Sequence, residues 1–99
     1  MKASSPLLRS AIGDVLRGAR TEQGLTLKEV SSTASMSVGH LSEIERGTKE
    51  SSSEILRSVC AALGLPMSEV LRDAGAALAN QERMANQDGA VAEMSRPHS

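Results

Sequence analysis

Residues 25–47, LTLKEVSSTASMSVGHLSEIERG, contain two short helical patterns separated by a turn of about three residues. Two helices joined this tightly must cross steeply, so apolar side chains have to lie where they cross. The positions at the crossing carry Val30, Ala34, Met36, Leu41 and Ile44, and the neighbouring Ser31 is small. We therefore predict two short helices packed across each other, and this pairing constrains the fold more than any other feature.

Such a crossing is typical of a helix-turn-helix motif. The alternative is an ordinary hairpin of two helices in a bundle. A hairpin would seldom place five apolar residues at these offsets beside so short a turn, and the spacing therefore favours the helix-turn-helix.

Helical periodicity and capping residues predict five helices. The expected helices cover residues 10–23, 27–33, 38–46, 52–63 and 66–74. Thr26 with Glu29, and Ser51 with Glu54, have the spacing of capping boxes, although Ser52 is an alternative cap to Ser51. Ser37 is the expected cap of the third helix. The expected C-terminal glycines are Gly24, Gly47 and Gly64.

The fold class expected from these elements is all-α, because no segment has the alternation of a strand. Residues 11–74 form a five-helix domain, and residues 75–99 form a helical extension that begins where Gly75 interrupts the fifth helix. Residues 1–10, which include Lys2 and Arg9, are expected to be a flexible arm. The tail beyond Asp88 is expected to be disordered.

The composition limits both the core and the chemistry. Apolar residues make up 39% of the chain but none is aromatic, so the core must be packed from aliphatic side chains on closely spaced helices. The N-terminus has no apolar stretch like that of a signal peptide, which predicts a cytoplasmic protein. The single cysteine, Cys60, falls at a core position and is expected to be an inert buried thiol rather than a redox sensor. We expect no metal site and no cofactor.

Charge is distributed unevenly along the chain. Residues 1–49 carry seven basic and five acidic side chains, and residues 50–99 carry four basic and seven acidic ones. The first half is therefore +2 and the second half −3. This asymmetry weakly favours an orientation with the N-terminal half toward a polyanion.

The segment LTLKEVSSTASMSVGHLSEIERG resembles the helix-turn-helix of the phage Cro and C1 repressor family, also called the xenobiotic-response-element family. The downstream SSSEILRSVCAALGL is similar to that family's fourth helix, and the resemblance covers residues 12–74. The run MSVGHLSEIERGTKESSSEIL further resembles the actinobacterial regulators of Clp protease genes. The resemblance implies a sequence-specific transcription regulator that binds double-stranded DNA, and in the second case an activator of Clp protease genes.

Two residues depart from the family pattern. Leu27 replaces a glutamine whose side chain often touches a phosphate, so one expected DNA contact is missing. Ser35 replaces a glycine that is common in the turn, so Ser35 is expected to adopt a positive φ at some cost.

A helical projection of residues 38–46 predicts the face that meets DNA. If Leu41 and Ile44 face the core, the base-facing residues are Val38, Gly39, Ser42, Glu43 and Arg46. Three of these residues also have a structural interpretation without DNA. Gly39 could be a mere packing gap, Arg46 could pair with Glu43 on the helix surface, and Val38 could be half buried at the start of the helix. The candidate phosphate contacts are Lys28, Ser37, His40, Thr48, Lys49, Ser51 and Ser52.

Two further groups of residues are assigned to assembly. The resemblance implies that Arg20 and Glu45 form an ion pair that joins the first helix to the recognition helix. Leu71, Leu78 and Ala85 recur every seven residues with Ala74 between them, which predicts a homodimer formed by the fifth helix and residues 76–87 on an inverted repeat. The alternative is a monomer whose C-terminal segment folds back on its own core.

Features of the sequence bear on three classes of function. The resemblance and the third helix favour a transcription regulator, and an activator would also contact RNA polymerase, for which Glu22 and Glu29 are candidates. The second class is a protein-interaction module, antitoxin-like or coactivator, that uses the acidic C-terminal half. The third, an enzyme, is disfavoured because the chain has only His40 and His98, no glycine-rich phosphate loop and no paired carboxylates in an expected cleft.

Overall fold

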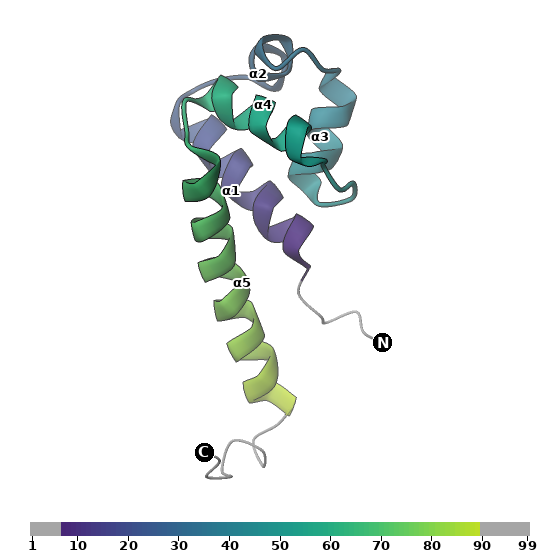
Figure 1. The fold of residues 1–99 in the computed structure, drawn as a ribbon. Helices are drawn as coiled ribbons and strands as arrows, with labels where there is room; N and C mark the ends of the chain where they lie inside the picture. Colours follow the sequence, from purple (N-terminus) through teal and green to yellow (C-terminus); the bar gives the residue numbers. More distant parts are fainter. Residues whose placement is uncertain (1–6, 90–99) are drawn as a thin grey trace.

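The computed structural model describes residues 7–89, which form five helices and no strand (Figure 1). The helices are α1 (Leu8–Glu22), α2 (Leu27–Thr33), α3 (Val38–Arg46), α4 (Ser53–Leu63) and α5 (Met67–Gly89). The predicted all-α class and the crossing of the second and third helices are confirmed. No helix in this part of the chain is long and apolar enough to cross a membrane.

The N-terminal caps follow the predicted chemistry with one exception. Thr26 and Glu29 form the complete capping box of α2, and the Ser37 hydroxyl accepts a hydrogen bond from the His40 backbone N–H at the start of α3. At α4 the Ser52 hydroxyl accepts from the Ile55 N–H, so Ser52 is the cap and the predicted box from Ser51 does not form.

Helix α1 begins at Leu8, two residues earlier than predicted. Arg9 is therefore part of a helix, and the prediction that places it in a flexible arm is wrong. The physical reason is a long-range contact: Arg9 donates from Nε to the Gly47 carbonyl at 2.8 Å. The rest of the predicted arm, residues 1–6, lies outside the described residues.

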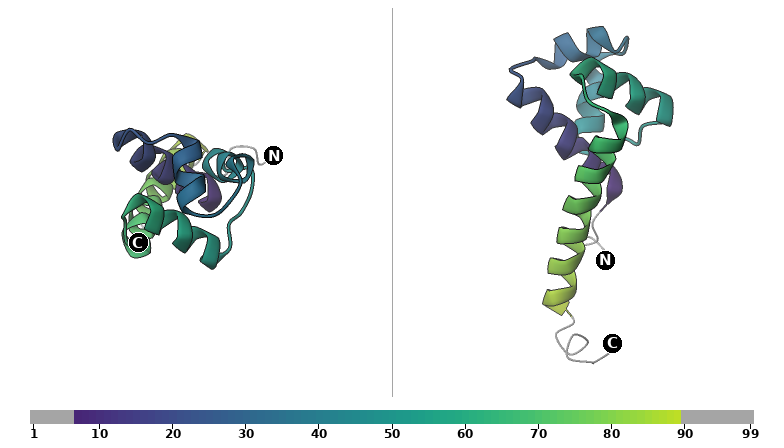
Figure 2. Two further views of the ribbon diagram at one scale, coloured as in Figure 1. Left: turned by 90° about the horizontal axis from the view of Figure 1, so that it is seen from above. Right: turned by 60° about the vertical axis from the view of Figure 1, so that its left-hand side comes forward.

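Helix α5 is continuous, and the predicted interruption at Gly75 is wrong. Gly75 has no positive φ, and a glycine with helical dihedrals costs a helix only about 1 kcal/mol relative to alanine. Val70 and Ala74, one turn apart, are completely buried and hold the first half of α5 against the domain. The second half extends beyond the other four helices (Figures 1 and 2). The tail predicted to be disordered beyond Asp88 lies outside the described residues from residue 90 on.

The core contains no aromatic side chain and is built around α1, whose most extensive contacts are with α5 and α3. Its centre consists of the fully buried Leu16, Leu41 and Ile44. Cys60 is also buried, and burial raises the pKa of its thiol, with a smaller opposing effect from the Arg57 charge. This agrees with the expectation of an inert thiol.

Gly13 is the point at which α1 and α3 approach most closely. A Cβ atom at Gly13 would lie 2.5 Å from the carbonyl oxygens of both Ile44 and Glu45. These are backbone atoms and cannot rotate away as a side-chain tip would. The position of α3 against α1 therefore depends on the absence of a side chain at residue 13.

We expect Gly13→Ala to lower the free energy of unfolding by about 2–3 kcal/mol, because α3 must move away from α1. Gly18→Ala is the matched control, since Gly18 lies in the same helix with nothing within 4 Å of an added Cβ. The control should raise stability by up to about 1 kcal/mol through helix propensity. Urea unfolding followed by circular dichroism measures both, and equal effects of the two substitutions would contradict the close approach.

Candidate nucleic-acid interface

Helix α3 presents one buried face to the domain and one exposed face to the surroundings. Leu41 and Ile44 are almost completely buried, as the helical projection requires. The predicted base-facing residues lie on the accessible side: Val38, Gly39 and Arg46 are exposed, and Ser42 and Glu43 are partly exposed. We call this set of five residues the outer face of α3.

The turn before α3 has the predicted strained residue. Ser35 has a φ of 58°, so the residue that replaces the common glycine does adopt the left-handed conformation. Backbone hydrogen bonds hold the turn on both sides, from Ala34 N–H to the Val30 carbonyl and from Met36 N–H to the Ser31 carbonyl. These two hydrogen bonds fix the turn and therefore the direction in which α3 begins.

Gly39 has open space beside it. Nothing lies within 4 Å of an added Cβ, so no neighbour in the protein requires glycine at this position. The alternative that Gly39 fills a packing gap is therefore wrong. A bare backbone on an exposed helical turn lets a ligand approach the main chain closely.

The polar side chains of the outer face pair differently from the predicted alternative. Arg46 donates to the Ser42 hydroxyl one turn earlier rather than pairing with Glu43. Glu43 instead lies 3.9 Å from the Lys49 ammonium, and both side chains are about half exposed. Such exposed contacts are weak, so these groups can exchange their partners for a ligand.

The candidate phosphate contacts other than Lys28, which lies on α2, are in α3 or in the segments at its two ends. Ser37 and Ser52 each cap a helix with their hydroxyl oxygen, which leaves the hydroxyl hydrogen free to donate. Thr48 donates its hydroxyl to the Glu43 carbonyl at 3.2 Å. Of the other candidates, Lys28 and Lys49 are exposed, whereas His40 and Ser51 are partly buried.

The structure brings in one residue that the sequence did not indicate. Arg9 donates to the Gly47 carbonyl at 2.8 Å and pairs with the Glu50 carboxylate at 3.2 Å, so it contacts the loop that follows α3. The contacts join residues 38 and 41 positions apart in the sequence. No local pattern around Arg9 signals them.

The predicted ion pair between Arg20 and Glu45 is present and bidentate. The Arg20 Nε and Nη2 atoms lie 2.8 and 3.0 Å from the two Glu45 carboxylate oxygens, and Nη1 donates to the Leu25 carbonyl at 2.9 Å. The hydrogen bond to Glu45 raises the pKa of Arg20, against the opposing effect of burial. Glu45 is only 7% exposed, so losing Arg20 would leave a buried carboxylate without its partner.

The residues predicted for dimerisation fall into three groups. Leu71 is 40% exposed and Leu78 is partly exposed, so both are accessible on α5. Ala74 is completely buried inside the protomer, and its assignment to a dimer contact is wrong because α5 packs through it on the domain. The side chain of Ala85 lies outside the part that the structure describes.

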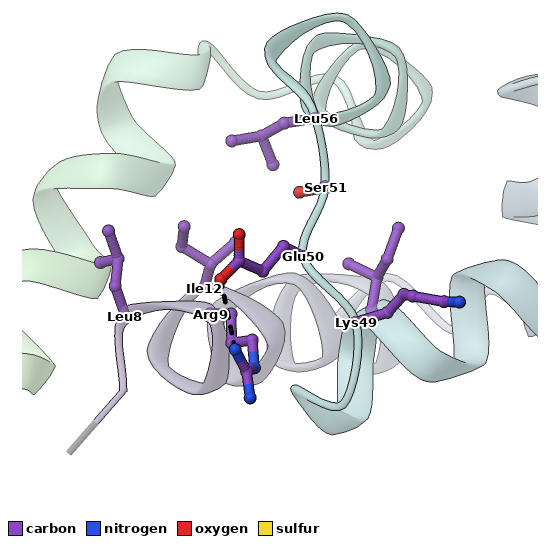
Figure 3. Close-up of a pocket in the computed structure, with 8 residues that line it drawn as sticks. Leu8, Arg9, Ile12, Lys49, Glu50, Ser51 and Leu56 are labelled. Atoms are coloured by element: carbon purple, nitrogen blue, oxygen red, sulfur yellow. Dashed lines mark hydrogen bonds and ion pairs between the residues drawn. The ribbon is translucent and has the colours of Figure 1, made fainter. Parts of the chain in front are cut away.

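Within residues 7–89, no three acidic, histidine or cysteine side chains are grouped so that they could hold a metal ion. A pocket of about 180 Å³ lies between α1, α4 and the loop that follows α3 (Figure 3). Its floor is aliphatic. The accessible polar chemistry near α3 is therefore that of hydrogen-bond donors, acceptors and cations on a protruding helix.

Comparison with known proteins gives consistent results. A family model described as helix-turn-helix matches residues 16–70. The transcriptional regulator ClgR of Mycobacterium tuberculosis is 62% identical over 79 residues, which are 80% of this chain and 70% of the relative. The crystal structure of the clp gene regulator ClgR from Corynebacterium glutamicum superposes with a TM-score of 0.80 at 45% identity, covering 95% of this chain and 99% of that one.

A more distant structure shares the fold alone. The restriction-modification controller protein C.AhdI from Aeromonas hydrophila has a TM-score of 0.61 at 22% identity, and the match covers 63% of this chain and 94% of the controller protein.

We expect Arg20→Met to destabilise the protein by about 3–5 kcal/mol, because it leaves the Glu45 carboxylate buried without a partner. The double variant Arg20→Met, Glu45→Leu removes both charges and should recover most of this loss. Urea unfolding of both variants at pH 7 measures the difference. A double variant less stable than Arg20→Met would show that the pair does not act as a unit.

Proposed function

This chain belongs to the Cro/C1-type helix-turn-helix family and is a transcriptional regulator of the ClgR type, not an enzyme, and we propose that it activates Clp protease genes as a homodimer on an inverted-repeat operator. The clp genes are suggested by the name of the Corynebacterium glutamicum relative. We place the protein in the cytoplasm, where the operator would be.

The outer face of α3 is the observation that carries the DNA-binding proposal. In a helix-turn-helix the N-terminal part of the motif's second helix, which is α3 here, enters the major groove. At that end of α3 the exposed Gly39 would let the backbone approach base edges. The opposite side of α3 is fixed by Leu41 and Ile44 in the core. A helix that is anchored on one side and has an accessible outer face on the other is suited to contacting base edges.

Each outer-face side chain has a base contact that its chemistry fits. Arg46 can donate two hydrogen bonds to guanine O6 and N7, and Ser42, already its neighbour, can either donate or accept. Glu43 can accept from cytosine N4, and Val38 can contact a thymine methyl group. We infer that the half-site contains G·C pairs opposite Arg46 and Glu43.

Phosphate contacts would come from the two ends of α3 and from α2. Ser37 lies at the start of α3, and Lys28 is exposed on α2. Beyond α3, Thr48, Lys49, Ser51 and Ser52 lead into the N-terminus of α4, which favours an anion through its free amides and dipole. His40 is partly exposed beside Ser37. These contacts would set the register of α3 without specifying sequence.

The operator can be identified by selecting bound duplexes from a random pool at about 0.15 M salt, the condition under which specific and non-specific affinities separate. We expect an enriched inverted repeat with half-sites about one helical turn apart. Arg46→Ala should bind the selected site with a loss of about 1–3 kcal/mol and relax the preference at one base pair per half-site.

Circular dichroism should show Arg46→Ala folded like the unaltered protein, because Arg46 is exposed. No enrichment by a folded protein would contradict DNA reading and favour the protein-interaction alternative. Placed upstream of a promoter, the selected site should raise transcript yield in a reconstituted reaction with RNA polymerase. A lower yield would show a repressor.

The dimer is proposed to form through α5, where Leu71 in the packed half and Leu78 further along lie on one side of the helix. Leu78→Glu places a charge in this contact and should convert the dimer to a monomer at micromolar concentration. Asn80→Glu adds the same charge about 200° around the helix from Leu78 and is the matched control. Light scattering measures the mass of each. A Leu78→Glu protein that keeps the mass of a dimer would exclude this surface.

A further inference from the structure

The loop from Gly47 to Ser52, which we call the α3–α4 loop, carries four of the seven candidate phosphate contacts and is poorly supported by the domain beneath it. The pocket of about 180 Å³ lies under it, lined by Leu8, Ile12 and Leu56 among others (Figure 3). Among residues 7–89, no backbone hydrogen bond involves Lys49, Glu50 or Ser51. Backbone hydrogen bonds therefore do not fix the middle of this loop.

Arg9 supplies the missing connection from the first turn of α1. Its guanidinium donates to the Gly47 carbonyl at 2.8 Å and to the Glu50 carboxylate at 3.2 Å. The next residue, Ser10, lies so close to Gly47 that a Cβ there would be 2.6 Å from the Ser10 hydroxyl. The start of α1 thus contacts the end of α3 at two successive residues.

The same contact separates the two opposite charges of the loop. Figure 3 shows the Glu50 side chain directed toward Arg9 and the Lys49 side chain directed away from it. Lys49 lies instead near Glu43 on the outer face of α3, at 3.9 Å. A carboxylate in a phosphate-binding loop repels DNA unless it is neutralised or turned aside, and Arg9 does both.

We propose that Arg9 is a positioning residue that holds the α3–α4 loop so that Lys49, and not Glu50, faces the DNA backbone. The inference rests on the proposed DNA binding and adds to it a residue outside the recognition motif. Arg9 affects DNA binding by setting the position of Lys49, and it does not itself contact a phosphate.

The test compares Arg9→Gln, Lys49→Gln and the double variant on the selected operator. Lys49→Gln removes one phosphate contact per protomer. Each lost contact should lower the magnitude of the slope of log affinity against log salt concentration by about 0.9 and weaken binding about fivefold at 0.15 M salt. We expect Arg9→Gln to reproduce most of this loss and the double variant to lose no more than Lys49→Gln. Arg9 and Glu50 are exposed enough that Arg9→Gln should remain folded.

Arg17→Gln is the matched control, because it removes the same charge from an exposed position of α1 about two turns beyond Arg9 and outside every proposed contact. It should leave the salt slope unchanged. Additive losses in the Arg9→Gln, Lys49→Gln variant would show that Arg9 binds a phosphate directly and would overturn the positioning role. An unchanged affinity of Arg9→Gln would overturn it as well.

A second measurement does not depend on DNA. Heteronuclear NOE values of the Lys49, Glu50 and Ser51 amides should fall in Arg9→Gln and stay unchanged in Arg17→Gln, because the hydrogen bonds to Gly47 and Glu50 come from Arg9 and not from Arg17. Unchanged loop amides in Arg9→Gln would contradict the inference whatever the DNA result. If no duplex binds the unaltered protein, the proposed function fails, and these amides still decide whether Arg9 orders the loop.

Discussion

The contact between α1 and α3 determines where α3 lies. At Gly13 the two backbones approach so closely that a methyl group would meet two carbonyl oxygens at 2.5 Å. The buried pair of Arg20 and Glu45 lies on the same contact, near the C-terminal end of α1, and Arg9 joins the first turn of α1 to the end of α3. Because these contacts are spread along one helix, α3 can neither slide nor rotate without breaking one of them. The outer face of α3 is thus presented at a fixed angle.

The features that the sequence predicts correctly depend on neighbours within one helical turn. The capping box of Thr26 and Glu29 and the cap at Ser37 are properties of four consecutive residues, and both are present in the structure. The positive φ of Ser35 could be predicted because the family that this segment resembles often has a glycine at this position. The outer face of α3 follows from helical periodicity once Leu41 and Ile44 are assigned to the core. Its contacts with DNA remain predictions.

The features that the sequence does not reveal depend on contacts between distant segments. Gly75 resembles a helix end, yet α5 continues because Val70 and Ala74 have already fixed its direction on the domain. The same burial removes Ala74 from any dimer surface, which heptad spacing alone cannot distinguish from a core position. Arg9 belongs to a polar N-terminal stretch, and only the fold brings it to Gly47. Packing across elements, rather than local propensity, decides each of these cases.

The distribution of ion pairs explains how a chain with a net charge of −1 can present a surface to a polyanion. Within residues 7–89 every ion pair has its acid in or directly after α3: Glu43 with Lys49, Glu45 with Arg20, and Glu50 with Arg9. Each carboxylate of α3 and of the α3–α4 loop therefore has a cation beside it. By contrast, Glu22, Glu69 and Asp73 line a groove between α1 and α5 and form no ion pair in the described part of the chain. These three acids lie on α1 and α5 rather than on α3, so the proposed approach to DNA would depend on the local field at α3 and not on the net charge alone.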